Sequence, residues 1–173
     1  MLGQGQYDIK TVSLSKNYVQ SIGGFRVLPD YDIKSVPKNY EALILIGGMT
    51  WRTENTQQIE ELVEQCYQKG KVLGAICDAS AFLGKVGVLN EVVHTSNDMN
   101  ALKKWAVSSY TGETKYIAKQ AVRDKNIITA NGTAPMEFAK EILLALNVAS
   151  KDKILDWYNF HKLGLYTAPM PKM

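Results

Sequence analysis

The sequence has few of the side chains that build disulfide frameworks or metal centres, with two cysteines and two histidines among 173 residues. These four residues, Cys66, Cys77, His94 and His161, are far apart and irregularly spaced. Zinc sites usually need closely spaced pairs such as Cys-x-x-Cys, so we expect no metal and no other cofactor. The two thiols lie in different sequence settings, and we interpret both as free rather than as a disulfide.

Long runs of one charge are also absent. The chain carries 20 basic and 17 acidic side chains, a formal net charge of +3, and the two signs are mixed along its length. Proteins that bind polyanions usually concentrate positive charge in a tail or a patch. The sequence therefore does not support nucleic acid as a partner.

Long hydrophobic runs are missing too. No stretch approaches the roughly 20 consecutive apolar residues that are needed to cross a bilayer. The opening residues, MLGQGQYDIK, contain neither the basic region nor the apolar region of a secretory signal. We therefore expect no membrane association and a cytoplasmic protein.

What is present is the composition of a globular domain, with 46% hydrophobic and 21% charged residues. A chain of 173 residues can bury one substantial core but is too short for two domains of ordinary size. We expect a single domain over residues 1–173, in which residues 150–173 form a C-terminal helix and tail.

The first half of the chain alternates between strand and helix patterns. Residues 7–13 predict a strand, and residues 25–28 predict a short strand that pairs with this first strand or with the return of the first strand. Residues 42–46 are continuously apolar and end in Gly47-Gly48, which is typical of a central parallel strand buried on both faces. An amphipathic helix over residues 53–69 follows, then a buried strand over residues 71–76.

The second half continues the alternation. It predicts a short strand at residues 92–93, a helix over 99–105, a hairpin between 117–122 and 127–130, and a last helix over 150–163. Another helix follows the hairpin, with Thr133 as its cap and Pro135 in its first turn. Such alternation implies a mostly parallel sheet covered on both faces, with the functional groups beyond the carboxyl ends of its strands.

Cys77 lies at such a strand end, immediately before a helical pattern. A nucleophile at a sharp strand-to-helix turn needs small neighbours two positions before and after it, and these are Ala75 and Ala79. The positive end of the helix favours thiolate over thiol. The amide N–H groups of Asp78 and of Gly48, on the adjacent loop, are placed to stabilise an oxyanion. The sequence therefore predicts a reactive Cys77.

Three segments in this order, ALILIGGMTW, GAICDASAFLGKVGVLN and IITANGTAPMEFAKEILLAL, resemble the ThiJ/PfpI family of the class I glutamine amidotransferase-like superfamily. The resemblance extends from Tyr7 to Val148. It implies a flavodoxin-like three-layer α/β sandwich with a mostly parallel sheet. It also implies that Cys77 is the catalytic nucleophile and that Gly48 and Asp78 supply the oxyanion hole.

The chain departs from the family pattern at its start. Members usually begin with a buried strand and a helix whose glutamate contacts the nucleophile, and this first strand and its glutamate have no counterpart here. Either the sequence is truncated, or another chain supplies the element, or the site works without it. An open sheet edge favours association, so we expect a homo-oligomer, most simply a dimer.

The general base is the second departure. True amidotransferases carry a late His and Glu pair, whereas residues 131–137 contain no histidine. His94, after a short strand, is the candidate catalytic base, although it fits equally a histidine that bonds to the backbone. Gly47, Trp51, Thr95 and Glu137 are the candidate pocket residues. Trp51 walls the pocket or only packs, and Glu137 reaches the site mouth or only starts a helix.

The resulting functional hypothesis is a cysteine-dependent hydrolase that acts on a small carbonyl or amide substrate through Cys77. Peptidase, amidase, deglycase and glyoxalase activities are all associated with the resembling family, and the sequence does not choose among them. The alternatives are a redox-sensing or stress-response protein that uses the same cysteine, or an inactive truncated member.

Overall fold

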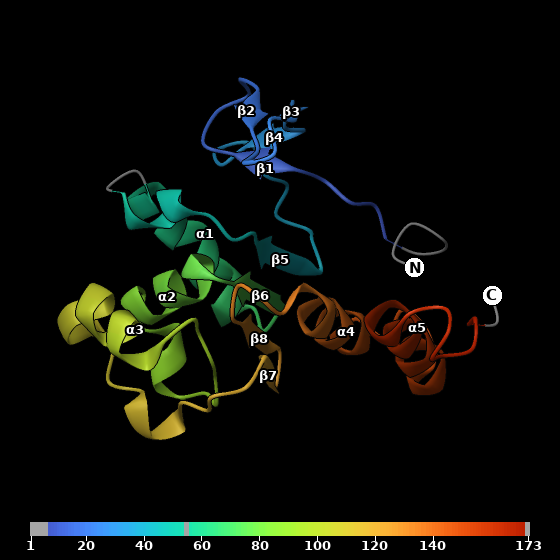
Figure 1. Cartoon of the computed structure of the whole chain (residues 1–173). Coiled ribbons are helices and arrows are strands. Elements are labelled where there is room, and N and C mark those ends of the chain that lie inside the picture. The colour runs from blue at the N-terminus through green and yellow to red at the C-terminus, as the bar shows by residue number, and fades with distance from the viewer. Residues whose placement is uncertain (1–6, 54–55, 172–173) are drawn as a thin grey trace.

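The computed structural model, which describes residues 7–53 and 56–171, is built around a four-stranded sheet between two layers of helices (Figure 1). The strand order is β5 (Ala42–Leu45), β6 (Val72–Ile76), β8 (Ile127–Ala130) and β7 (Ala121–Asp124). The β5–β6 and β6–β8 pairs are parallel, and β7 joins β8 as an antiparallel hairpin, as predicted. The expected three-layer α/β sandwich with a mostly parallel sheet is confirmed.

Helices cover both faces of this sheet. On one face lie α1 (Gln57–Gln68), α2 (Asp78–Lys85) and α3 (Met99–Ala106), and on the other lies α4 (Pro135–Ala145) (Figure 1). Helix α5 (Lys151–Leu163) packs against α4, farther from the sheet. Short 3-10 helices complete the connections: η2 (Met49–Arg52), η4 (Val88–Asn90), η5 (Val107–Ser109) and η6 (Glu113–Lys115).

Strand β6 explains why its sequence is apolar at every position. Leu73 and Ala75 are fully buried in the core beneath α1 and α2, whereas Val72 lies in the second core, beneath α4. Successive side chains of a strand point to opposite faces, so a strand covered on both sides needs apolar residues throughout. The carboxyl end of β6, where Cys77 follows, is thereby held between two packed layers.

The amphipathic helix forms as α1, which starts at Gln57 rather than at residue 53. Residues 54–55 of the predicted range lie outside the described residues. Val63 and Cys66 on its inner stripe are fully buried. Gly70 follows the helix with φ of 61°, the left-handed conformation that commonly ends a helix. Cys66 is therefore a core residue, and burial raises the pKa of its thiol to about 11.

The predicted cap of α4 is wrong. The capping position is Ala134, which makes no side-chain cap bond, and Pro135 is the first helical residue. The Thr133 hydroxyl instead donates a hydrogen bond to Oδ1 of Asn131 at 2.7 Å. The asparagine closes a local turn and so competes successfully for the threonine side chain.

The chain before β5 forms two small ribbons, which stand above the main sheet in Figure 1. Strand β1 (Val12–Ser13) pairs in parallel with β4 (Tyr31–Asp32), and β2 (Val19–Gln20) pairs antiparallel with β3 (Arg26–Val27). The strand predicted over residues 7–13 is thus shorter than expected, because only its last residues find a backbone partner. The strand predicted at residues 25–28 forms as β3 and pairs with β2, which precedes it in the chain, rather than with β1.

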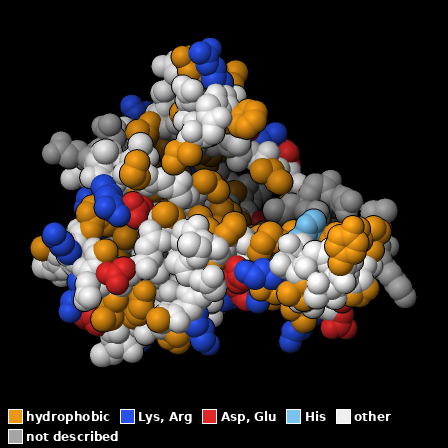
Figure 2. Space-filling view, viewed as in Figure 1, with side chains coloured by type: hydrophobic (Ala, Val, Ile, Leu, Met, Phe, Trp, Pro, Cys, Tyr) orange, Lys and Arg blue, Asp and Glu red, His pale blue; other side chains and the backbone are white. Residues whose placement is uncertain are grey.

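Strand β5 was predicted to be a central strand of the sheet, but it lies at one end of the strand order. Among the described residues it pairs with β6 alone and therefore forms one edge of the sheet. Ile46, directly after it, is 68% exposed. Figure 2 shows hydrophobic side chains around the hollow between the upper ribbons and the main body. The edge and the nearby apolar surface are the features that led us to expect association.

Within the described residues, none of the helices combines the length and the hydrophobicity that a membrane span requires. Over the same ranges, histidine, cysteine, aspartate and glutamate side chains form no cluster of three or more that is arranged to hold a metal ion.

Candidate functional site

Cys77 occupies the sharp turn between β6 and α2. Its backbone has φ of 61° and ψ of −135°, a conformation that residues other than glycine rarely adopt. The neighbours Ala75 and Ala79 are fully buried, and the Cys77 amide donates to the Ala130 carbonyl at 2.9 Å. The surrounding structure thus holds a strained residue in place, a combination found preferentially at functional sites. The predicted strand-turn-helix elbow is present.

Two glycines leave room for the Cys77 side chain. A β-carbon on Gly47 would lie 2.8 Å from Cβ of Cys77, and one on Gly132 would lie 3.0 Å from its Sγ. Gly47 follows β5, Gly132 follows β8, and both are exposed, whereas Cys77 is half-buried. The loops after three neighbouring strands therefore converge on the side chain of a half-buried cysteine.

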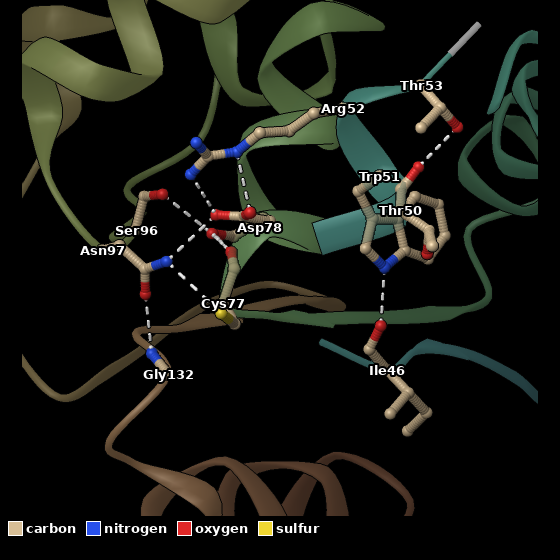
Figure 3. A network of polar contacts seen from close by, with 11 residues as sticks. Ile46, Thr50, Trp51, Arg52, Thr53, Cys77, Asp78, Ser96, Asn97 and Gly132 are labelled. Carbon is tan, nitrogen blue, oxygen red and sulfur yellow. Dashed lines mark hydrogen bonds and ion pairs between the residues drawn. The ribbon is translucent and has the colours of Figure 1, made fainter. Parts of the chain in front are cut away.

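A polar network joins Cys77 to three further side chains (Figure 3). The Asn97 amide nitrogen, Nδ2, donates to Sγ of Cys77 at 3.3 Å and to Oδ1 of Asp78 at 3.2 Å. Arg52 holds Asp78 from the other side, with Nη2 at 2.9 Å from Oδ1 and Nε at 2.8 Å from Oδ2. Asp78 is almost completely buried, and the ion pair and the amide together compensate for the burial of its carboxylate.

The residues of the predicted oxyanion donors, Asp78 and Gly48, lie at the start of α2 and on the loop after β5. Asp78 is the first residue of α2, so its N–H belongs to the first turn, where helical amides have no partner within the helix. Gly48 immediately precedes η2 on the adjacent loop. Trp51 fixes this loop, because its Nε1 donates to the Ile46 carbonyl at 2.6 Å and its ring lies 5.0 Å from that of Phe82 in α2. Trp51 therefore packs in support of the loop.

His94 is not part of this network. It is fully buried, and its ring nitrogens Nδ1 and Nε2 lie 2.8 Å from the Val92 carbonyl and 2.8 Å from the Tyr110 hydroxyl, respectively. Burial lowers the pKa of His94, and the bond to Val92 opposes this only in part. Both nitrogens have partners other than Cys77, so Asn97 rather than His94 contacts the thiol.

Thr95 and Glu137 also use their polar groups elsewhere. The Thr95 hydroxyl donates to the Lys119 carbonyl at 2.9 Å. Oε1 of Glu137 accepts from Nζ of Lys162 at 2.7 Å and from the Tyr158 hydroxyl at 2.9 Å. Glu137 thus links α4 to α5.

A surface cavity of about 360 Å³ borders the network. The residues that line it include Thr95, Ser96, Asn97, Tyr116, Lys119 and Asn131. Asn97 is shared between this cavity and the contact with Cys77. The cavity lining is mostly polar, with hydroxyl, amide and ammonium groups.

Sequence reasoning missed Arg52, Asn97 and Gly132. Arg52 lies in the segment MTWR after the Gly-Gly strand end, and Asn97 immediately precedes Asp98, which caps α3. A polar residue before a helix cap is a common pattern and does not by itself indicate a contact with a distant thiol. Gly132 lies in a turn-forming segment, so its loop was predictable but its proximity to Cys77 was not.

Known proteins share both the sequence and the fold. The DJ-1/PfpI family model matches residues 1–145. The chain is 38% identical to the uncharacterized protease YdeA of Bacillus subtilis strain 168 over 160 residues, which are 92% of this chain and 79% of that protein.

Two solved structures are also similar. A ThiJ/PfpI family protein from Bacillus anthracis has a TM-score of 0.82 at 37% identity, covering 87% of this chain and 71% of that one. The DJ-1 superfamily protein Atu0886 from Agrobacterium tumefaciens has a TM-score of 0.79 at 30% identity, covering 89% and 84% of the two chains. The resemblance noted in the sequence is therefore confirmed, and this chain belongs to the DJ-1/PfpI family.

Proposed function

We propose that the protein is a cysteine-dependent enzyme in which Cys77 attacks a small carbonyl or amide substrate. The observation that carries the proposal is the strained, accessible Cys77 at the amino end of α2, between two glycine loops. In the first step the Cys77 sulfur forms a bond to the carbonyl carbon. The electron pair of the C=O π bond moves to the oxygen, which becomes an oxyanion.

The amide N–H groups of Asp78 and Gly48 then stabilise the oxyanion. With an aldehyde or ketone, protonation by water gives a reversible adduct. With an amide, the oxyanion collapses, the C–N bond breaks and a proton from solvent converts the leaving group to an amine. Water then hydrolyses the thioester. The protease names of the Bacillus relatives are compatible with the second route, and both substrate classes belong to the proposal.

Differential alkylation of the two cysteines tests this function. We expect iodoacetamide at neutral pH to modify Cys77 much faster than free cysteine in solution, as mass spectrometry of the peptides would show. Cys66 is an internal control, because it is fully buried and its thiol has a raised pKa. Activity on a panel of small aldehydes and amides is expected to vanish in Cys77→Ser. A Cys77 that reacts no faster than free cysteine would contradict the proposal.

A redox-sensing function is the second candidate, favoured by the N–H donor that Asn97 directs at the half-buried sulfur. Hydrogen peroxide would transfer one oxygen to the thiolate to give a sulfenate and water, and a second peroxide would give the sulfinate. The donor is then positioned to bond to an S–O group. Mild peroxide should add two oxygens to Cys77 and leave Cys66 unmodified, whereas oxidation of both cysteines at similar rates would exclude a selective sensor.

A further inference from the structure

Asn97 is the side chain that contacts the sulfur of Cys77, and its orientation follows from its other partners. The backbone N–H of Gly132 donates to Oδ1 of Asn97 at 2.7 Å. An N–H group cannot accept a hydrogen bond, so the oxygen of the amide must face Gly132 and the nitrogen must face the opposite way. The NH₂ group consequently points at Cys77 and Asp78, as Figure 3 shows.

The two hydrogens of that NH₂ group match the two acceptors beside it. One is directed to Oδ1 of Asp78 at 3.2 Å and the other to Sγ of Cys77 at 3.3 Å. The next residue, Asp98, caps α3, because its Oδ1 accepts from the Ala101 amide at 2.7 Å. Asn97 is therefore held between a helix cap and the Gly132 loop, and its donor group is positioned before any substrate arrives.

The charged groups around Cys77 indicate what the NH₂ group of Asn97 does for the sulfur. Asp78 places a carboxylate beside the thiol, and its negative charge disfavours a second negative charge on the sulfur. Arg52 offsets the charge of Asp78 through two bonds. The NH₂ group of Asn97 contacts both acceptors, and a donated N–H bond is stronger to a thiolate than to a neutral thiol.

From this geometry we infer that Asn97 is a catalytic residue that stabilises the anionic sulfur of Cys77 beside the carboxylate of Asp78. The inference rests on the proposed function, because it assigns a task in activating the same nucleophile. A neutral carboxamide cannot accept the proton of the thiol, so Asn97 stabilises charge and does not act as a base. The proton leaves Cys77 to solvent.

Two variants separate the donor from its structural support. Asn97→Ala removes both the bond to Cys77 and the acceptor for Gly132. Asn97→Asp has nearly the same shape and keeps an oxygen for the Gly132 N–H, but it replaces the donor with a second carboxylate beside the sulfur. We expect alkylation of Cys77 at neutral pH to slow by roughly tenfold or more in Asn97→Ala, and further in Asn97→Asp.

The ultraviolet absorbance of the Cys77 thiolate provides a second measurement beside the alkylation rates. The ultraviolet absorbance of the thiolate, obtained by subtracting the spectrum of the matched Cys77→Ser protein, should fall in both variants. Asn131→Ala is the matched control, since Asn131 lies next to Gly132 in the loop after β8 and bonds to Thr133 and Gln120 rather than to Cys77. The alkylation rate of Cys77 in this control should stay within about twofold of the wild-type rate. That change is smaller than the slowing expected when a hydrogen bond to a charged group is lost.

Wild-type rates and absorbance in Asn97→Asp would overturn the inference, because that variant retains an oxygen for the loop contact but loses the donor and gains a carboxylate beside the sulfur. Equal losses in Asn97→Asp and Asn131→Ala would also overturn it, since the effect would then belong to the loop. A different result would contradict the proposed function: Cys77 of the wild-type protein would react no faster than free cysteine. Even in that case, a Cys77 that is slower in Asn97→Ala but not in Asn131→Ala would still support the role of Asn97, because neither variant adds a charge.

Discussion

The backbone of Gly47 faces the side chain of Cys77 so closely that a β-carbon at Gly47 would lie 2.8 Å from Cβ of Cys77 and 3.3 Å from the Ile76 carbonyl oxygen. Neither obstacle is the flexible end of a side chain. The elbow and the Gly-Gly loop can therefore approach each other only because position 47 has no side chain.

Gly47→Ala should consequently destabilise the protein by about 1–3 kcal/mol, the usual cost of forcing an extra carbon into a close contact. Urea unfolding measures the change. In a Cys77→Gly background the same substitution should cost less, because its nearest obstacle is gone. An equal cost in the two backgrounds would show that the Gly47–Cys77 contact is not what restricts this position.

The ion pair between Arg52 and Asp78 connects η2 to the start of α2 and thereby holds the two loops beside Cys77 together. Arg52→Gln should lower the melting temperature, because it removes the cationic partner of a nearly buried carboxylate. Adding Asp78→Asn should recover part of the loss, since no buried charge is then left unpaired. Thermal unfolding of the wild type, the two single variants and the double variant measures the coupling between Arg52 and Asp78. If the losses of the two single variants simply add in the double variant, the two side chains do not stabilise each other.

His94 should make stability depend on pH. Burial lowers the pKa of His94 in the folded protein, whereas in the unfolded chain it titrates near its ordinary value of about 6.5. The unfolded state therefore binds more protons in this range. The stabilising contribution is complete above about pH 6.5 and is lost as the pH falls through the lower, folded-state pKa.

His94→Gln should flatten the decline of unfolding free energy between about pH 7 and pH 5, because glutamine does not titrate in this range. Urea denaturation at several pH values provides the measurement. His161→Gln is the comparison variant, since it replaces the second histidine of the chain, which is exposed on α5. A wild-type slope in His94→Gln would mean that another group causes the pH dependence.

Glu137 should govern the attachment of α5. Burial acts to raise the pKa of Glu137, but the hydrogen bonds from Lys162 and Tyr158 outweigh it and hold the pKa below its ordinary value. Its stabilising contribution is present above about pH 4.5 and is lost as the pH falls through the lower, folded-state pKa. Glu137→Ala removes the acceptor for both partners on α5.

We expect Glu137→Ala to accelerate proteolysis within residues 151–163 at neutral pH, with fragments identified by mass spectrometry. Glu141→Ala is the matched control, because Glu141 lies on the same helix but pairs with Lys140 of that helix. Equal protection of α5 in both variants would show that apolar packing alone holds it.

Association through the open side of β5 stays a prediction. Sedimentation equilibrium should give a dimer, and Ile46→Lys should shift it toward monomer, because a charge beside an unpaired strand opposes pairing. Leu163→Lys, at the exposed end of α5, should have no such effect. A wild-type monomer across the concentration range would rule out this mode of association.

The elbow was predictable because its requirements are local. Ala75, Cys77 and Ala79 lie within five consecutive residues, and the apolar run before them can be read directly. The late hairpin and α4 were predictable for the same reason, although the cap of α4 was not. At that turn the Thr133 hydroxyl could cap the helix or bond within the loop, and it bonds to Asn131.

By itself, then, the sequence determined the alternation of strands and helices, the family, and the residue presented at the turn, because hydrophobic periodicity and small side chains act over short distances. Only the tertiary structure decided which side chains surround that residue. Asn97, Arg52 and Gly132 reach the site from separate loops, with Asn97 20 positions from Cys77 and 35 from Gly132. It also decided that His94 turns into the core, since a buried ring bonds to the nearest backbone and hydroxyl groups rather than to a more distant thiol.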